Sequence, residues 1–122
     1  ARGLPPGAAA EGDAAVDSVV QYLDAADFDA VVGGDTPVLV DYYATWCGPC
    51  RLMDPTVVEL AKQYEGRLQV YKLDCGAHKE KCKELGIRML PTFQTYRNGE
   101  LLQEMFGTST DKLTEIINSA VA

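Results

Sequence analysis

The chain has 122 residues, 47% of them hydrophobic, and a formal net charge of −7 at pH 7. This length predicts one domain with its own buried core, and no apolar run approaches the roughly 20 residues of a membrane-spanning helix. The acidic charge argues against nucleic-acid binding, which usually requires a basic face.

The N-terminal segment is rich in Ala, Gly and Pro and shows no periodic pattern. We therefore expect a flexible tail over residues 1–15 and one domain over residues 16–122. The chain begins without Met, and no cationic segment precedes an apolar one, so no secretory signal is expected. Two interpretations of this start stay open, a cleaved transit peptide and an artificial boundary.

Strands and helices are predicted to alternate through most of the domain. In chain order we expect a strand at 18–23, a helix at 25–32, a strand at 38–43, a helix at 47–64, a strand at 68–74, a helix at 79–85, strands at 92–97 and 101–106, and a last helix with Thr110 as its N-cap. The nearly continuous apolar run at 38–43 is typical of a central strand covered on both faces. Asn98-Gly99 predicts a hairpin. The order predicts an α/β fold, a central mixed five-stranded sheet flanked by four helices.

Cys47 and Cys50 form a C-x-x-C pair where the apolar strand passes into a helix. Unpaired amides and the positive end of the helix dipole favour thiolate over thiol at such a position, so we expect a lowered pKa for Cys47. The thiolate is the attacking species in disulfide exchange. We therefore expect Cys47 to be the nucleophile and Cys50 the resolving thiol, with Gly48 allowing the turn and Pro49 restricting it.

An alternative is that this pair forms half of a zinc or iron–sulfur site. Such a site needs a second pair of Cys or His ligands at suitable spacing. The candidates are Cys75, His78 and Cys82, but we expect His78 to be solvated and expect no metal.

Asp41 interrupts the apolar strand that leads to the cysteine pair. Burial disfavours a charged carboxylate, so we expect a raised pKa for Asp41. A carboxyl of this kind near Cys50 can take up and return a proton during the exchange. The alternative is a structural Asp bonded to the backbone. Trp46 also has two interpretations, an apolar contact for a protein substrate or a core residue.

The segment Trp46-Cys-Gly-Pro-Cys50 resembles the active-site motif of the thioredoxins. Over residues 18–122, further matches in order and spacing are Val38-Leu-Val-Asp41, Pro55, Leu90-Pro91-Thr92, Asn98-Gly99 and Gly107. The resemblance implies the thioredoxin fold and a protein-disulfide reductase that carries electrons on its dithiol and needs no cofactor.

The resemblance also assigns roles to individual residues. It implies that Cys47 attacks, that Cys50 resolves, and that Asp41 accepts the proton with the basic Lys72 beside it. It implies that Pro91 is a cis-proline facing the dithiol. The residues implied to contact substrate are Trp46, Gly48, Pro49, Leu90, Pro91 and Gly107.

The implied partners are target proteins that contain disulfides, together with a reductase that recharges the dithiol. This reductase is ferredoxin–thioredoxin reductase or NADPH–thioredoxin reductase, and the chain is expected to act as a monomer. We expect a location in the chloroplast stroma, with the cytoplasm or mitochondrion as alternatives. The alternative functions are a non-catalytic binding subunit of a larger complex and a disulfide oxidase or isomerase; in this family, Pro49 goes with a reducing role.

Cys75 resembles the extra cysteine of the chloroplast f-type thioredoxins, in the segment Lys72-Leu-Asp-Cys75. That likeness implies a regulatory thiol open to glutathionylation, and the alternative is an inert thiol. Cys82 lies in a lysine-rich helix and is interpreted as a bystander thiol. A Cys75–Cys82 disulfide is a further alternative that the sequence does not favour. The acidic net charge counts against the f-type assignment, although a local basic rim is present at Lys79, Lys81, Lys83 and Arg88.

Overall fold

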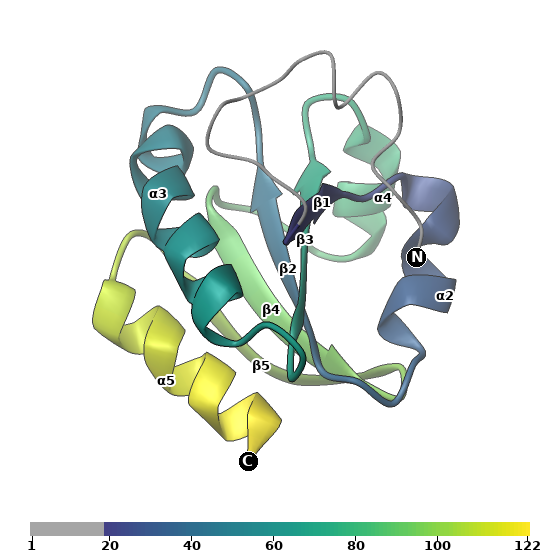
Figure 1. The fold of residues 1–122 in the computed structure, drawn as a ribbon. Coiled ribbons are helices and arrows are strands. Elements are labelled where there is room, and N and C mark those ends of the chain that lie inside the picture. Colours follow the sequence, from purple (N-terminus) through teal and green to yellow (C-terminus); the bar gives the residue numbers. More distant parts are fainter. Residues whose placement is uncertain (1–18) are drawn as a thin grey trace.

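The computed structural model describes residues 19–122 (Figure 1). The tail expected over 1–15 lies outside the described residues. In the described part of the chain, no helix has the length and apolar character needed to cross a membrane.

The described residues form a five-stranded sheet in the order β1-β3-β2-β4-β5. Its strands are β1 (Val20–Tyr22), β2 (Val38–Tyr43), β3 (Gln69–Asp74), β4 (Thr92–Arg97) and β5 (Glu100–Phe106). The first three pair in parallel, and β4 and β5 add antiparallel to β2. The predicted mixed sheet is confirmed, and β2 occupies its centre, as its continuous apolar run indicated.

Helices cover both faces of the sheet. In Figure 1, α3 (Gly48–Gln63) and α5 (Thr110–Val121) lie on one side, and α2 (Phe28–Val32) and α4 (Lys79–Glu84) lie on the other. Successive residues of β2 divide between two buried clusters: Leu39 packs with α3 and α5, whereas Val38 and Val40 pack with Phe28 and Val32 of α2. This alternation follows from the two-residue period of a strand.

Two helix starts differ from the predictions in detail. The helix expected at 25–32 is divided into a 3-10 turn, η1 (Ala25–Asp27), and α2, and the side chain of Asp24 accepts a hydrogen bond of 2.8 Å from the amide of Ala26. The predicted N-cap of the last helix, Thr110, is wrong. Ser109 has the extended backbone of an N-cap, and its Oγ accepts a hydrogen bond of 3.1 Å from the amide of Lys112.

The hairpin predicted at Asn98-Gly99 is present between β4 and β5. Both turn residues have positive φ, 54° for Asn98 and 80° for Gly99, as a tight two-residue turn requires. The amide of Asn98 donates to the carbonyl of Gly34 at 2.7 Å, and the amide of Gly99 donates to that of Val32 at 2.8 Å. These bonds tie the hairpin to the end of α2.

Candidate active site

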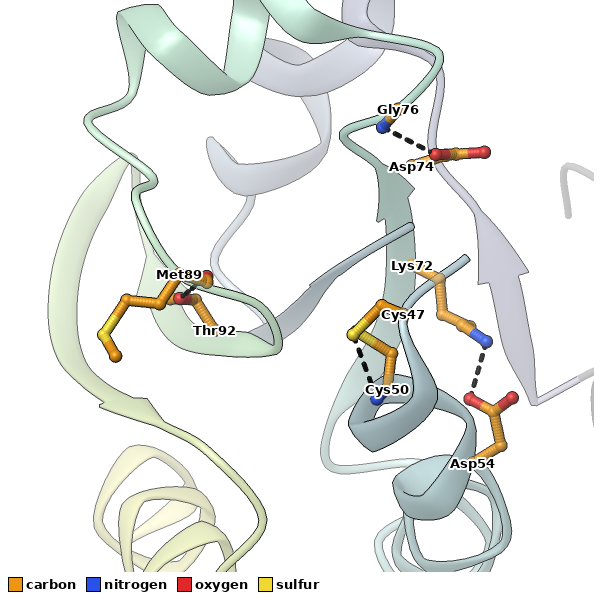
Figure 2. Close-up of a disulfide and its surroundings, with 8 residues drawn as sticks. All are labelled: Cys47, Cys50, Asp54, Lys72, Asp74, Gly76, Met89 and Thr92. Atoms are coloured by element: carbon orange, nitrogen blue, oxygen red, sulfur yellow. Dashed lines mark hydrogen bonds and ion pairs between the residues drawn. A yellow bond between two sulfur atoms is a disulfide. The ribbon is translucent and has the colours of Figure 1, made fainter. Parts of the chain in front are cut away.

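The cysteine pair lies at the junction between β2 and α3. Cys47 is the N-cap of α3, with an extended backbone, and its Sγ accepts a hydrogen bond of 3.2 Å from the amide of Cys50 (Figure 2). The sulfur thus occupies the position that an oxygen takes in an ordinary N-cap. The same amide would stabilise a thiolate at Cys47 once the pair is reduced.

Cys47 and Cys50 are joined by a disulfide, with their Cα atoms 5.3 Å apart. Both residues are buried, with relative exposures of 6% and 3%, and they pack against Tyr43 and Ala44 with Leu90 at the edge. Pro49 lies in the first turn of the helix and Gly48 begins it. The structure therefore places Cys50 in the first turn of α3, three residues after Cys47, which caps the helix.

Asp41 is buried in the middle of β2, with a relative exposure of 1%. Its Oδ1 has no hydrogen-bond partner among the described residues. Burial raises the pKa of this carboxyl to about 7; the charge of Lys72 lowers it, and the charge of Asp54 raises it. The carboxyl therefore changes its protonation state near neutral pH, which a group that exchanges protons requires.

Lys72 lies opposite Asp41 in the register of β3 and β2. Its side chain, however, forms an ion pair with Asp54 of α3, with 2.8 Å between Nζ and Oδ1 (Figure 2). The ammonium also lies 4.5 Å from the centre of the Tyr43 ring. The resemblance placed Lys72 beside Asp41 and did not include this pairing.

Asp54 is a site residue that the sequence reasoning missed. It is buried within α3 and lies one helical turn beyond Cys50. Residues four apart share a helix face, so an acid at this spacing from Cys50 was the signal available in the sequence.

The segment around Pro91 lies against the cysteine pair. The Leu90–Pro91 peptide bond is cis, as the resemblance implied. Leu90 packs on the cysteine cluster, and the amide of Gly107 donates to the carbonyl of Pro91 at 3.0 Å. Nearby, Thr92 Oγ1 donates to the carbonyl of Met89 at 2.6 Å (Figure 2).

Trp46 is 73% exposed, so its interpretation as a core residue is wrong. A Cβ atom on Gly76 would lie 3.5 Å from Trp46 Nε1, which places the indole beside the turn that follows β3. Met89 is also largely exposed. Trp46 directly precedes Cys47, and Met89 directly precedes Leu90, which packs on the cysteine cluster. Both side chains present apolar surface to solvent.

A second disulfide joins Cys75, the residue after β3, to Cys82 of α4, with 5.7 Å between the Cα atoms. The interpretation of Cys82 as a bystander thiol is therefore wrong, and the disulfide that the sequence did not favour is present; Cys82 is buried, with a relative exposure of 4%. The helix that starts after His78 turns residue 82 inward, where it packs with the cluster that contains Cys75. A regulatory role for Cys75 as a free thiol would first require reduction of this bond. His78 itself is half-buried at the start of α4.

We expect the Cys75–Cys82 bond to stabilise the fold by about 2–3 kcal/mol, because it removes loop-closure entropy from the unfolded chain. A Cys47→Ser, Cys50→Ser variant isolates the effect, since Cys75 and Cys82 are its remaining cysteines. Urea unfolding of this variant with and without dithiothreitol should differ by that amount. Further replacement of Cys75 and Cys82 by serine is the control and should abolish the difference. Equal stability of the first variant under both conditions contradicts the prediction.

Within residues 19–122, no group of three or more His, Cys, Asp or Glu side chains is arranged to hold a metal ion. Each of the four cysteine sulfurs is bonded to another sulfur. The site therefore consists of a disulfide at a helix N-terminus, a buried carboxyl of raised pKa and a cis-proline segment.

Comparison with known proteins gives a consistent result. The thioredoxin family model matches residues 19–119. The M-type chloroplast thioredoxin of Pisum sativum is 41% identical over 93 residues, which cover 76% of this chain and 54% of that protein. The chain thus spans about half the length of this relative.

Solved structures with the same fold include thioredoxin f from spinach chloroplast in its short form. That structure matches with a TM-score of 0.80 and 35% identity, over 88% of this chain and 100% of that one. A second match is the structure of a complex of ferredoxin:thioredoxin reductase and thioredoxin f2, with a TM-score of 0.78 and 34% identity over 84% of this chain and 96% of that chain.

A Cys-x-x-Cys disulfide whose first cysteine caps a helix after a central strand is an arrangement suited to thiol–disulfide exchange. The predicted class, a protein-disulfide reductase, is confirmed by the family match together with this pair. The chain belongs to the thioredoxin family.

Proposed function

We propose that this chain reduces disulfides in target proteins through Cys47 and Cys50, as part of redox regulation in the chloroplast. The observation that carries the proposal is the disulfide itself, closed between the N-cap of α3 and its first turn. The oxidised pair is the product that such a reaction leaves on the protein, and a reductase must restore the dithiol.

In the first step, the Cys47 thiolate attacks one sulfur of the target disulfide. A bond forms between Cys47 Sγ and that sulfur, and the second target sulfur leaves with the electron pair and takes a proton from solvent. The helix N-terminus favours the attacking thiolate, because the amide of Cys50 already points at Cys47 Sγ.

In the second step, Cys50 gives its proton to the Asp41 carboxylate and attacks Cys47 Sγ. The first target sulfur leaves with the electron pair and is protonated in turn. The two protein sulfurs have then lost two electrons to the target, which is released as a dithiol. Because the pKa of Asp41 is about 7, both of its protonation states are populated at neutral pH. Lys72 is the proposed supporting residue, because at its observed position its charge offsets part of the rise that burial causes in the pKa of Asp41 and so keeps a fraction of the carboxyl ionised at neutral pH.

Target recognition is assigned to the exposed rim of the site. Trp46 offers an apolar surface, and Gly48 and Pro49 form the exposed start of α3. The backbone around Leu90 and Pro91 can pair with an extended segment of the target. Gly107 follows β5 and bonds to Pro91, so it lies at the same rim.

The chloroplast stroma is the proposed location, and ferredoxin–thioredoxin reductase is the proposed electron donor. Two findings support this choice: the similarity to chloroplast M-type thioredoxin and spinach thioredoxin f, and the fold shared with the thioredoxin f2 of the reductase complex. NADPH–thioredoxin reductase is the alternative donor, and the chain is proposed to act as a monomer.

A Cys50→Ser variant tests the proposal, because it retains the attacking thiol and lacks the resolving one. We expect it to form stable mixed disulfides with chloroplast stromal enzymes, which dithiothreitol then releases for identification. The matched control carries Cys47→Ser as well and should capture none of them. Equal capture by both variants, or no capture by either, contradicts the proposed mechanism.

A further inference from the structure

Asp54, which forms the ion pair with Lys72, has no role in the exchange reaction described above. Both side chains are largely buried, with relative side-chain exposures of 4% for Lys72 and 10% for Asp54. A buried charge is costly to desolvate unless it is paired, so each group depends on the other. The pair therefore holds the Lys72 ammonium in one place.

This place lies next to the cysteine pair. A cavity of about 380 Å³ is lined by Tyr22, Tyr43, Ala44, Thr45, Cys50, Arg51, Asp54 and Lys72. Asp54 and Cys50 come from the same helix, whereas Lys72 reaches the cavity from β3 (Figure 2). The ion pair and the resolving cysteine thus share one wall of the site.

Asp41 is the register partner of Lys72 in the neighbouring strand, β2. The charged groups that act on it are Lys72 of β3 and Asp54 of α3, the helix that also carries Cys50, and the apolar Phe93 lies opposite it on β4. The remaining titratable or charged groups at the cavity are Tyr22, Tyr43 and Arg51. Two carboxyl groups, Asp41 and Asp54, therefore compete for the single ammonium of Lys72, and Asp54 holds it at 2.8 Å.

We propose that Asp54 is a positioning residue of the dithiol centre: it holds the ammonium of Lys72 away from Asp41, so that Asp41 remains able to exchange a proton with Cys50. If Asp54 were neutral, Lys72 would turn toward Asp41 and stabilise its carboxylate. An ammonium in direct contact lowers a carboxyl pKa by about one to three units. Asp41 would then stay ionised at neutral pH and would accept a proton from Cys50 far less readily. This inference rests on the proposed reductase function.

The test is the titration of Asp41 in the oxidised chain, followed by the ¹³C chemical shift of its carboxyl carbon. In the unmodified chain the midpoint should lie near pH 7. In Asp54→Asn we expect it to fall by at least about one pH unit. Glu59→Gln, an exposed acid on the same helix, is the matched control and should leave the midpoint unchanged. An unchanged midpoint in Asp54→Asn overturns the inference.

The same titration in a Lys72→Met variant distinguishes an effect of Asp54 that is exerted through Lys72 from direct repulsion between the Asp54 and Asp41 carboxylates. In Lys72→Met, no ammonium can turn toward Asp41, so adding Asp54→Asn should no longer produce the full downward shift. An equal shift with and without Lys72 overturns the positioning role. Asp54→Ala replaces Asp54→Asn if the latter does not fold, since alanine favours the helix and equally releases Lys72.

The titration tests this inference, and the reductase assay tests the proposed function, so either proposal can be contradicted without the other. A chain that reduces insulin but shows no shift in Asp54→Asn retains the proposed function and loses this inference. A chain that shows the shift but reduces no protein disulfide loses the proposed function.

Discussion

Replacing Cys47 by serine is expected to lower the rate of insulin reduction by more than about a hundredfold, to the rate of dithiothreitol alone. Serine keeps the size of the side chain and its capacity to accept the amide hydrogen bond of Cys50. Its hydroxyl is a far weaker nucleophile than a thiolate and forms no disulfide. The measurement is the rate at which insulin precipitates after its chains are separated, with dithiothreitol as the electron source.

The matched control uses the other two cysteines of the chain. Cys75→Ser combined with Cys82→Ser removes the second disulfide but leaves the helix cap and the Cys47–Cys50 pair in place. This variant should keep its activity at a temperature where it is folded. If Cys47→Ser retains the activity of the unmodified chain, the role assigned to Cys47 is wrong.

The second large effect concerns stability. Asp41→Asn is expected to raise the free energy of unfolding at pH 8 by roughly 4 kcal/mol. The reason is that Asp41 must lose its proton inside the core: its pKa is about 7 in the folded chain, against an ordinary value of 3.8. Asparagine has nearly the same shape and carries no charge, so it avoids this cost of burial.

The sign of this effect depends on pH. Between pH 4 and pH 7 the folded chain binds more protons at Asp41 than the unfolded chain does, so this group lowers stability as the pH rises. The difference between Asp41→Asn and the unmodified chain should therefore be small at pH 4, grow through this range and level off above pH 7. Urea unfolding of the oxidised proteins at several pH values measures it. Asp35→Asn, at an exposed loop position, is the control. A difference that is independent of pH contradicts the assignment.

Much of the fold was predictable because local sequence patterns and packing agree. The apolar run at 38–43 predicted a central strand, and the structure bonds β2 to a strand on each side. Asn98-Gly99 predicted the hairpin, since its backbone requires positive φ. The N-cap of the last helix was misplaced by one residue because Ser109 and Thr110 both carry a suitable hydroxyl and only the backbone geometry distinguishes them.

The site was predictable to the extent that it is local in sequence. Cys47 and Cys50 lie in one helical turn, so their relation follows from their spacing. The pairing of Lys72 with Asp54 joins residues 18 positions apart on different elements and depends on how α3 packs over β3. The Cys75–Cys82 bond similarly depends on the direction in which α4 turns its inner face. No periodic pattern in the sequence encodes either contact.

The central position of β2 has a consequence for how the molecule opens. β1 and β5 are the two borders of the sheet, and each is bonded along one side only. Hydrogen exchange should accordingly be fastest at these borders and slowest in β2, because fluctuations free outer strands first. Asp41 and the chain leading into Cys47 are anchored to the segment that stays closed longest. The Cys47 and Cys50 sulfurs thus keep their arrangement when partial unfolding releases the edge strands β1 and β5.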